Sequence, residues 1–234
     1  MMDAVRTFLQ ESAYFGLVIS LIGYELGLFL KRKLKWAICN PLLLSVIFVM
    51  AFVALTGVSV KSYQSSASLR SYLLTPATVC LAVPLYEQFS LLQKHVRAVL
   101  AGIVSGVIAS LACILLMSWA FSLPHELYVT LLPKSITTAI GMGVSGELGG
   151  ITTITVAVII ITGILGNVIA ETVLRLFRIT DPIAKGLAMG TSAHAIGTAK
   201  AMEMGRIEGA MSSLAIAVCG LLTVIASPLF AGLY

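Results

Sequence analysis

Long apolar runs separated by short polar stretches dominate this chain of 234 residues. A helix that crosses a membrane needs about 20 mainly apolar residues. Five runs have about this length and lie at 13–30, 41–58, 97–120, 151–174 and 209–232. Three further apolar stretches are interrupted by polar or helix-breaking residues and lie at 72–92, 131–148 and 184–203. The pattern predicts an all-α polytopic membrane protein with about five to eight transmembrane segments, some of them broken or re-entrant.

The composition supports a membrane protein and excludes several other classes. Hydrophobic residues make up 59% of the chain and charged residues 11%, whereas a soluble domain carries about 25% charged residues. No stretch is long and polar enough for a separate soluble domain, so we expect a single membrane domain over residues 1–234. The net charge of +5 comes from basic residues between apolar runs, which indicates topology signals and no nucleic-acid binding. Motifs of hydrolases, zinc enzymes and P-loop proteins are absent, so we expect neither enzyme activity nor a cofactor or metal.

The basic residues also predict the topology. The densest cluster, KRKLK at 31–35, is expected in the cytoplasm. If 131–148 crossed the membrane, Arg175, Arg178 and Lys185 would lie outside; if it dips in and returns, they lie inside. We favour the return, because it places nine of the fifteen basic residues in the cytoplasm.

This topology makes two parts of the chain resemble each other. Residues 41–120 and 151–232 each contain a span, a broken segment and a span, in opposite orientations. Thr75 and Glu87 correspond to Thr191 and Glu203 at a common offset, although so sparse a match can also arise by chance. Inverted repeats around broken helices are typical of secondary transporters.

The first broken segment is TPATVCLAVP at 75–84. Its two prolines oppose a continuous helix, and Thr75 and Thr78 add hydroxyls. Freed carbonyls in lipid need partners, so such a break either lines a wet cavity or is packed inside protein. A kinked helix without a site is the alternative.

The second broken segment is KSITTAIGMGVSGELGG at 134–150. Lys134 supplies a positive charge, and Ser135, Thr137 and Thr138 supply hydroxyls. A half-helix that starts here would direct its free amides and positive dipole end at an anion. The alternative is a re-entrant loop stabilised by its own hydroxyls, with Lys134 reaching to the membrane surface.

The third broken segment is GTSAHAIGTAK at 190–200. His194 and Thr198 share a helix face by their spacing of four, with Ser192 nearby. If the helix breaks near Gly190 or at Gly197, these groups converge on the same cavity as 134–138. Alternatively, His194 bonds a backbone carbonyl of a neighbouring helix.

A pair of glycines lies on the same stretch. Gly186 and Gly190 are one helical turn apart. Small residues at this spacing predict close approach of a neighbouring backbone.

Several of these segments together resemble the LrgB/CidB family. The resemblance is carried by NPLL at 40–43, PATVCLAVPLYEQ at 76–88, LLPKSITTAIGMGVSGELGGI at 131–151, TGILG at 162–166 and KGLAMGTSAHAIGTAKAMEMGRIEGAMSSLA at 185–215. It implies a multi-pass protein of the bacterial cytoplasmic (inner) membrane. It also implies two competing functions: a holin/antiholin-like modulator of murein hydrolase activity and autolysis, acting with a small LrgA/CidA-type membrane partner, or transport of a small monocarboxylate. The transported acid is pyruvate for some bacterial members, and glycolate or glycerate for the related plastid translocator.

One position departs from the family pattern. Ala139 follows the two threonines of the second segment, where the family often has proline. A break in this segment would then rest on Gly141 and Gly143.

Of the two functions, the broken segments favour the transporter, because a holin-type pore does not need hydroxyl, lysine and histidine groups at helix breaks. We therefore expect alternating-access transport of a small carboxylate anion by a protein embedded in membrane lipid, as a homo-oligomer and preferably a dimer. The expected binding residues are Lys134, Ser135, Thr137, Thr138, Ser192, His194, Thr198, Thr75 and Thr78.

Overall fold

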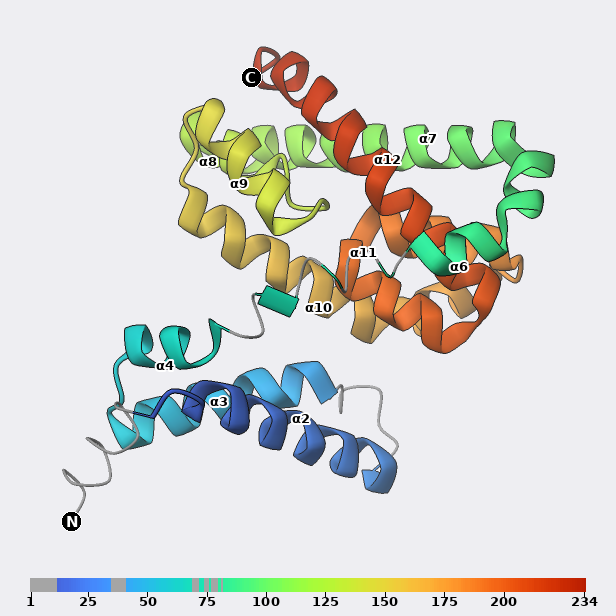
Figure 1. The fold of residues 1–234 in the computed structure, drawn as a ribbon. Coiled ribbons are helices and arrows are strands. Elements are labelled where there is room, and N and C mark those ends of the chain that lie inside the picture. The colour runs from blue at the N-terminus through green and yellow to red at the C-terminus, as the bar shows by residue number, and fades with distance from the viewer. Residues whose placement is uncertain (1–11, 35–40, 69–71, 74–75, 77–79, 81) are drawn as a thin grey trace. The chain divides into compact units, whose positions relative to one another are not determined.

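A computed structural model describes residues 12–34, 41–68, 72–73, 76, 80 and 82–234. The chain divides into two compact units, Met1–Cys80 and Leu81–Tyr234. Every regular element in the described residues is a helix (Figure 1), which confirms the all-α prediction. The division falls inside the interrupted stretch 72–92.

The first unit contains α2 (Phe15–Leu34), α3 (Pro41–Thr56) and α4 (Val60–Ser66). The first two helices overlap the predicted spans 13–30 and 41–58, but neither is among the described helices that are long and apolar enough to cross a membrane. Helix α4 is tied back to the start of α2, because the Ser66 hydroxyl accepts a hydrogen bond of 2.9 Å from the Gly16 amide. Three residues of the basic cluster, Lys31, Arg32 and Lys33, lie in the last turn of α2, where cations are favoured by the helix dipole.

The described residues of the second unit contain α6–α12, and three of these helices are long and apolar enough to cross a membrane. These candidate spans, 93–121, 152–176 and 206–231, correspond to the predicted runs at 97–120, 151–174 and 209–232. The elements are α6 (Ala82–Glu87), α7 (Phe89–Phe121), α8 (His125–Leu131), α9 (Thr138–Glu147), α10 (Thr152–Leu176), α11 (Pro182–Met204) and α12 (Arg206–Ala231).

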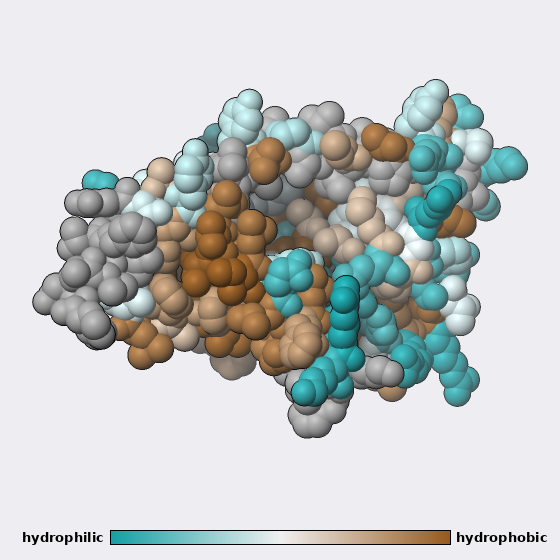
Figure 2. Space-filling model, turned by 60° about the horizontal axis from the view of Figure 1, so that its bottom comes forward, coloured by the Kyte–Doolittle hydropathy of each residue, from teal (hydrophilic) through white to brown (hydrophobic). Residues whose placement is uncertain are grey.

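The surface agrees with this membrane assignment. In Figure 2, many hydrophobic side chains (brown) lie on the surface of the face in view. Exposed apolar side chains of this kind suit a bilayer, because its hydrocarbon core offers no water to polar side chains.

Residues 131–150 leave the end of α8 and return to it. The Thr130 hydroxyl accepts a hydrogen bond of 2.8 Å from the Ile151 amide, and the Thr155 hydroxyl donates to the Thr130 carbonyl at 2.9 Å. Helix α9, with ten residues, is about 15 Å long and covers half of a bilayer's hydrocarbon core. The chain path is therefore the returning one, which we call the first hairpin (residues 131–150).

The interruption of the first hairpin lies elsewhere than expected. Helix α9 runs without a break through Gly141 and Gly143, and the irregular backbone precedes it, up to the extended Thr137. Pro133 has no amide hydrogen to continue helix α8, so the proline before Lys134 marks the break instead of the two glycines.

Helix α11 is broken at Ala193 and His194, where the backbone angles are φ −127°, ψ 16° and φ 42°, ψ −138°. The second half folds back on the first: a Cβ added to Gly197 would lie 2.6 Å from the carbonyl oxygen of Met189. The break was expected near Gly190 or at Gly197. It falls between them, because Gly197 is used for close packing of the two halves. We call residues 182–204 the second hairpin.

The first half of α11 packs tightly on α12. A Cβ on Gly186 would lie 2.5 Å from the carbonyl oxygen of Glu208, and one on Gly190 would lie 2.5 Å from that of Ser212. This confirms the predicted close approach of a neighbouring backbone. Because 186 meets 208 and 190 meets 212, the first half of α11 runs parallel to α12. Residues 151–232 thus form a span, a broken segment and a span.

Candidate functional site

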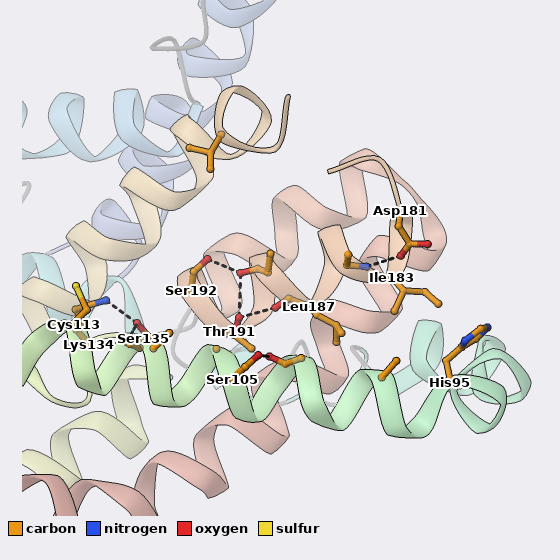
Figure 3. Close-up of a pocket in the computed structure, with 18 residues that line it drawn as sticks. His95, Ser105, Cys113, Lys134, Ser135, Asp181, Ile183, Leu187, Thr191 and Ser192 are labelled. Carbon is orange, nitrogen blue, oxygen red and sulfur yellow. Dashed lines mark hydrogen bonds between the residues drawn. The ribbon is translucent and has the colours of Figure 1, made fainter. Parts of the chain in front are cut away.

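A cavity of ≈ 960 Å³ lies between α7 and the first half of α11. One wall consists mainly of small residues of α7, and the other is formed by α11 (Figure 3). Lys134 and Ser135, from the first hairpin, lie at one end, and His95 and Asp181 lie toward the other. The volume is at the upper end of the range for small-molecule sites.

Lys134 dominates the first end of the cavity. Its ammonium donates to the hydroxyl of Ser135 at 3.0 Å, and this hydroxyl also lies 3.1 Å from that of Ser110 on α7. Ser135 is buried and Lys134 half-buried. Among the residues that the structure describes, no carboxylate pairs with Lys134. An ammonium removed from bulk water is stabilised by an anionic partner, so this end suits a carboxylate.

The distant end has a different character. The backbone of α7 is kinked at His95 (φ −119°, ψ 16°), which lies on the exposed part of the helix. The Asp181 carboxylate accepts a hydrogen bond of 2.9 Å from the Ala184 amide and so caps α11, with Pro182 at the first helical position. The cavity therefore carries its cation at one end and its carboxylate at the other.

Three hydroxyls between the two ends are already used by their own helices. The Ser105 hydroxyl donates to the Gly102 carbonyl at 3.0 Å. Thr191 and Ser192 donate in the same way to carbonyls of α11 one turn earlier, at 2.8 Å and 2.6 Å. The dashed lines in Figure 3 show these bonds. The middle of the cavity consequently presents few free hydrogen-bond donors.

The structure brings together only part of the expected binding set. Lys134, Ser135 and Ser192 line the cavity. Thr137 and Thr138 lie at the start of α9 and are not part of its wall.

His194 and Thr198 also lie outside the cavity wall. His194 is only 4% exposed, and its Nε2 lies 2.9 Å from the carbonyl oxygen of Ile159 on α10. This contact agrees with the alternative given for His194 above, a hydrogen bond to a backbone carbonyl of a neighbouring helix. The Thr198 hydroxyl lies 2.7 Å from that of Ser212 on α12. The fold-back at Ala193–His194 turns the second half of α11 away from the cavity, which is why these groups do not converge there.

Two expected residues cannot be placed. Thr75 and Thr78 lie outside the described residues. Their contribution to the cavity stays a prediction.

Sequence reasoning missed Ser110, Cys113 and Thr191, which line the cavity. A signal exists for the α7 residues. Gly102, Gly106 and Ser110 recur every four residues, and this spacing places small side chains on one face of a helix. The residues around them in the sequence, however, give no indication that Lys134 would face them.

The comparison with protein families agrees with the motifs that run through both hairpins. The sequence model of the LrgB-like family matches residues 20–233. The chain belongs to the LrgB-like family. This confirms the resemblance seen in the sequence and identifies a membrane protein of the LrgB/CidB type. The matched range includes the cavity, both hairpins and all helices of the second unit. No solved structure matches this chain.

Proposed function

We propose that this LrgB-like protein is a secondary transporter of a small monocarboxylate such as pyruvate or glycolate. It works by alternating access in the bacterial cytoplasmic membrane. The observation that carries the proposal is the Lys134 ammonium at one end of a large cavity, without a carboxylate partner among the described residues.

The local chemistry suits a single carboxylate. Lys134 offers a positive charge, and the hydroxyls of Ser135 and Ser110, 3.1 Å apart, can rotate to donate to an anion. Hydrogen bonds in which one partner is charged are shorter and stronger than neutral ones. One cation balances one negative charge, which favours monocarboxylates over dicarboxylates.

The arrangement of the two hairpins supports a carrier. The first hairpin begins and ends at the start of α10, and the second follows the end of α10, so they approach from opposite ends of this helix. Both reach Ile159: its Cδ1 would lie 2.5 Å from a Cβ on Gly141, and its carbonyl oxygen meets His194. Broken helices that meet inside the membrane are typical of secondary transporters.

The assembly is part of the same proposal. We expect a homo-oligomer, preferably a dimer, in membrane lipid. A small LrgA/CidA-type partner belongs to the competing role, a holin/antiholin-like modulator of murein hydrolase activity and autolysis.

Uptake into proteoliposomes tests the proposal. Vesicles with the purified protein are given labelled pyruvate or glycolate, and the initial rate is measured against concentration. We expect saturable uptake that is lost in Lys134→Met and retained in Lys94→Met, which removes an exposed lysine of α7 outside the cavity wall. A non-saturable leak of unrelated solutes, equal in both variants, would contradict the transporter and favour the pore-like role.

A further inference from the structure

The cavity extends far beyond the Lys134 end. Beyond the kink at His95, its wall on α7 reaches from Ala98 to Cys113. These two residues are fifteen positions apart, which corresponds to about 22 Å along the helix axis. A volume of ≈ 960 Å³ is enough for a drug-sized ligand. A three-carbon acid held at Lys134 would occupy only one end of this space.

The middle of the cavity is an apolar trough. Its α7 wall carries Gly102, Gly106 and Ala109, and its α11 wall carries Leu187 and Ala188. The hydroxyls of Ser105, Thr191 and Ser192 in this region donate to carbonyls of their own helices. None of them therefore requires a polar ligand as a hydrogen-bond partner. Apolar walls without free donors favour burial of hydrocarbon over burial of polar groups.

We infer that the same cavity binds medium-chain alkyl monocarboxylates, with the carboxylate at Lys134 and the alkyl chain along the trough between Ala109 and Leu187. The inference rests on the carboxylate site proposed above and extends its substrate class. Charge complementarity places the carboxylate at Lys134, which is the only lysine or arginine in the described cavity wall. The trough then receives the chain, and each buried CH₂ strengthens binding about threefold to fourfold.

Cys113 provides a reporter for binding. It lines the cavity next to Lys134 (Figure 3) and is exposed. A ligand at the Lys134 end would therefore shield it from alkylation. The rate at which maleimide modifies Cys113 in the purified full chain is followed by mass spectrometry, with increasing acetate, butyrate, hexanoate or octanoate and, in a separate series, with glycolate.

The chain-length series separates this inference from the proposed function. We expect the protecting concentration to fall at least a hundredfold from acetate to octanoate. Equal protection by all four acids overturns the inference but leaves the carboxylate site standing, since glycolate and acetate then still protect. Failure of every acid, glycolate included, overturns the carboxylate site as well. Octylamine, which has the chain without the carboxylate, is expected to give no protection.

Two variants test where the chain lies. Ala109→Leu fills the trough, whereas Ala101→Leu places the same side chain on an exposed position of α7 outside the cavity wall. We expect Ala109→Leu to weaken protection by octanoate at least tenfold more than protection by acetate. Ala101→Leu is expected to keep the dependence on chain length. The thermal unfolding midpoint shows that both variants are folded. Equal octanoate protection in the two variants would overturn the assignment of the trough.

Discussion

The imidazole Nε2 of His194 lies 2.9 Å from the carbonyl oxygen of Ile159, across thirty-five positions of the chain. Because a carbonyl can only accept, Nε2 carries the proton and donates. The ring lies against Gly163, where an added Cβ would come within 2.7 Å of its Cε1. His194 itself adopts φ 42°, a conformation that is strained for a residue with a side chain. The hydrogen bond to α10 and the packing on Gly163 hold the tip of the second hairpin in this conformation.

Replacement of His194 by alanine is expected to destabilise the protein. The variant loses a buried ring and a hydrogen bond, and leaves the Ile159 carbonyl without this donor. We expect a loss of about 2–4 kcal/mol in the free energy of unfolding, measured as a lower thermal unfolding midpoint in detergent. His125→Ala removes an exposed histidine and is the control. Equal midpoints for the two variants would show that the tip of the hairpin does not depend on His194.

Gly163 and His194 are expected to be energetically coupled. Gly163→Ala places a methyl group against the His194 ring, so we expect a clear drop in the unfolding midpoint. In the His194→Ala background the added methyl group no longer meets the ring and meets only the flexible end of Ile196, whose Cδ1 lies 2.8 Å away. The change is therefore expected to cost less, with a coupling energy of about 0.5–3 kcal/mol. Gly143→Ala is the control, since nothing lies within 4 Å of a Cβ there. Additive effects of the two substitutions would contradict the contact.

Tyr234 is expected to anchor the C-terminus to the end of α7. Its hydroxyl donates to the carbonyl oxygens of Leu123 at 2.5 Å and Ser118 at 3.2 Å, and its ring centroid lies 4.9 Å from that of Tyr128. Tyr234→Phe keeps the ring and removes both bonds. We expect a loss of about 1–2 kcal/mol, which lowers the unfolding midpoint by about 2–8 °C. Tyr86→Phe, at an exposed tyrosine, should leave the midpoint unchanged; a similar shift in both would refute the anchor.

Labelling from each side of the membrane tests the topology. In a variant without native cysteines, Glu126→Cys probes the segment after α7, and Thr180→Cys probes the segment after α10. Since the first hairpin returns to its starting point, only α10 separates these positions. We expect an impermeant maleimide to label Glu126→Cys from outside and Thr180→Cys from the cytoplasm. Labelling of both from one side would reject the returning path.

The spans and the capped start of α11 were predictable from the sequence. A membrane helix satisfies its backbone hydrogen bonds within itself, so about 20 apolar residues are enough to indicate α7, α10 and α12. The start of α11 is equally local: Asp181 caps the amide of Ala184, three residues on. Charge distribution also favoured the returning path of residues 131–150, because topology depends on where basic residues lie.

The cavity and the role of His194 were decided by contacts between distant segments. Ser135 meets Ser110, and His194 meets Ile159, across 25 and 35 positions. No local pattern specifies such pairs, since they depend on how helices pack and where a break turns the chain. The expectation that His194 and Lys134 share one cavity assumed a break at a glycine. The break at Ala193–His194 instead directs the imidazole at α10, and leaves Lys134 to face the small residues of α7.

Membrane insertion and helix position thus follow from the order of apolar and charged residues, because transfer of each segment into lipid is a property of that segment alone. Which polar side chains face a common space follows only from the packed fold. A side chain finds its partner by the close approach of backbones, as where Gly186 and Gly190 bring α11 against α12, and that approach is a property of the whole assembly of helices.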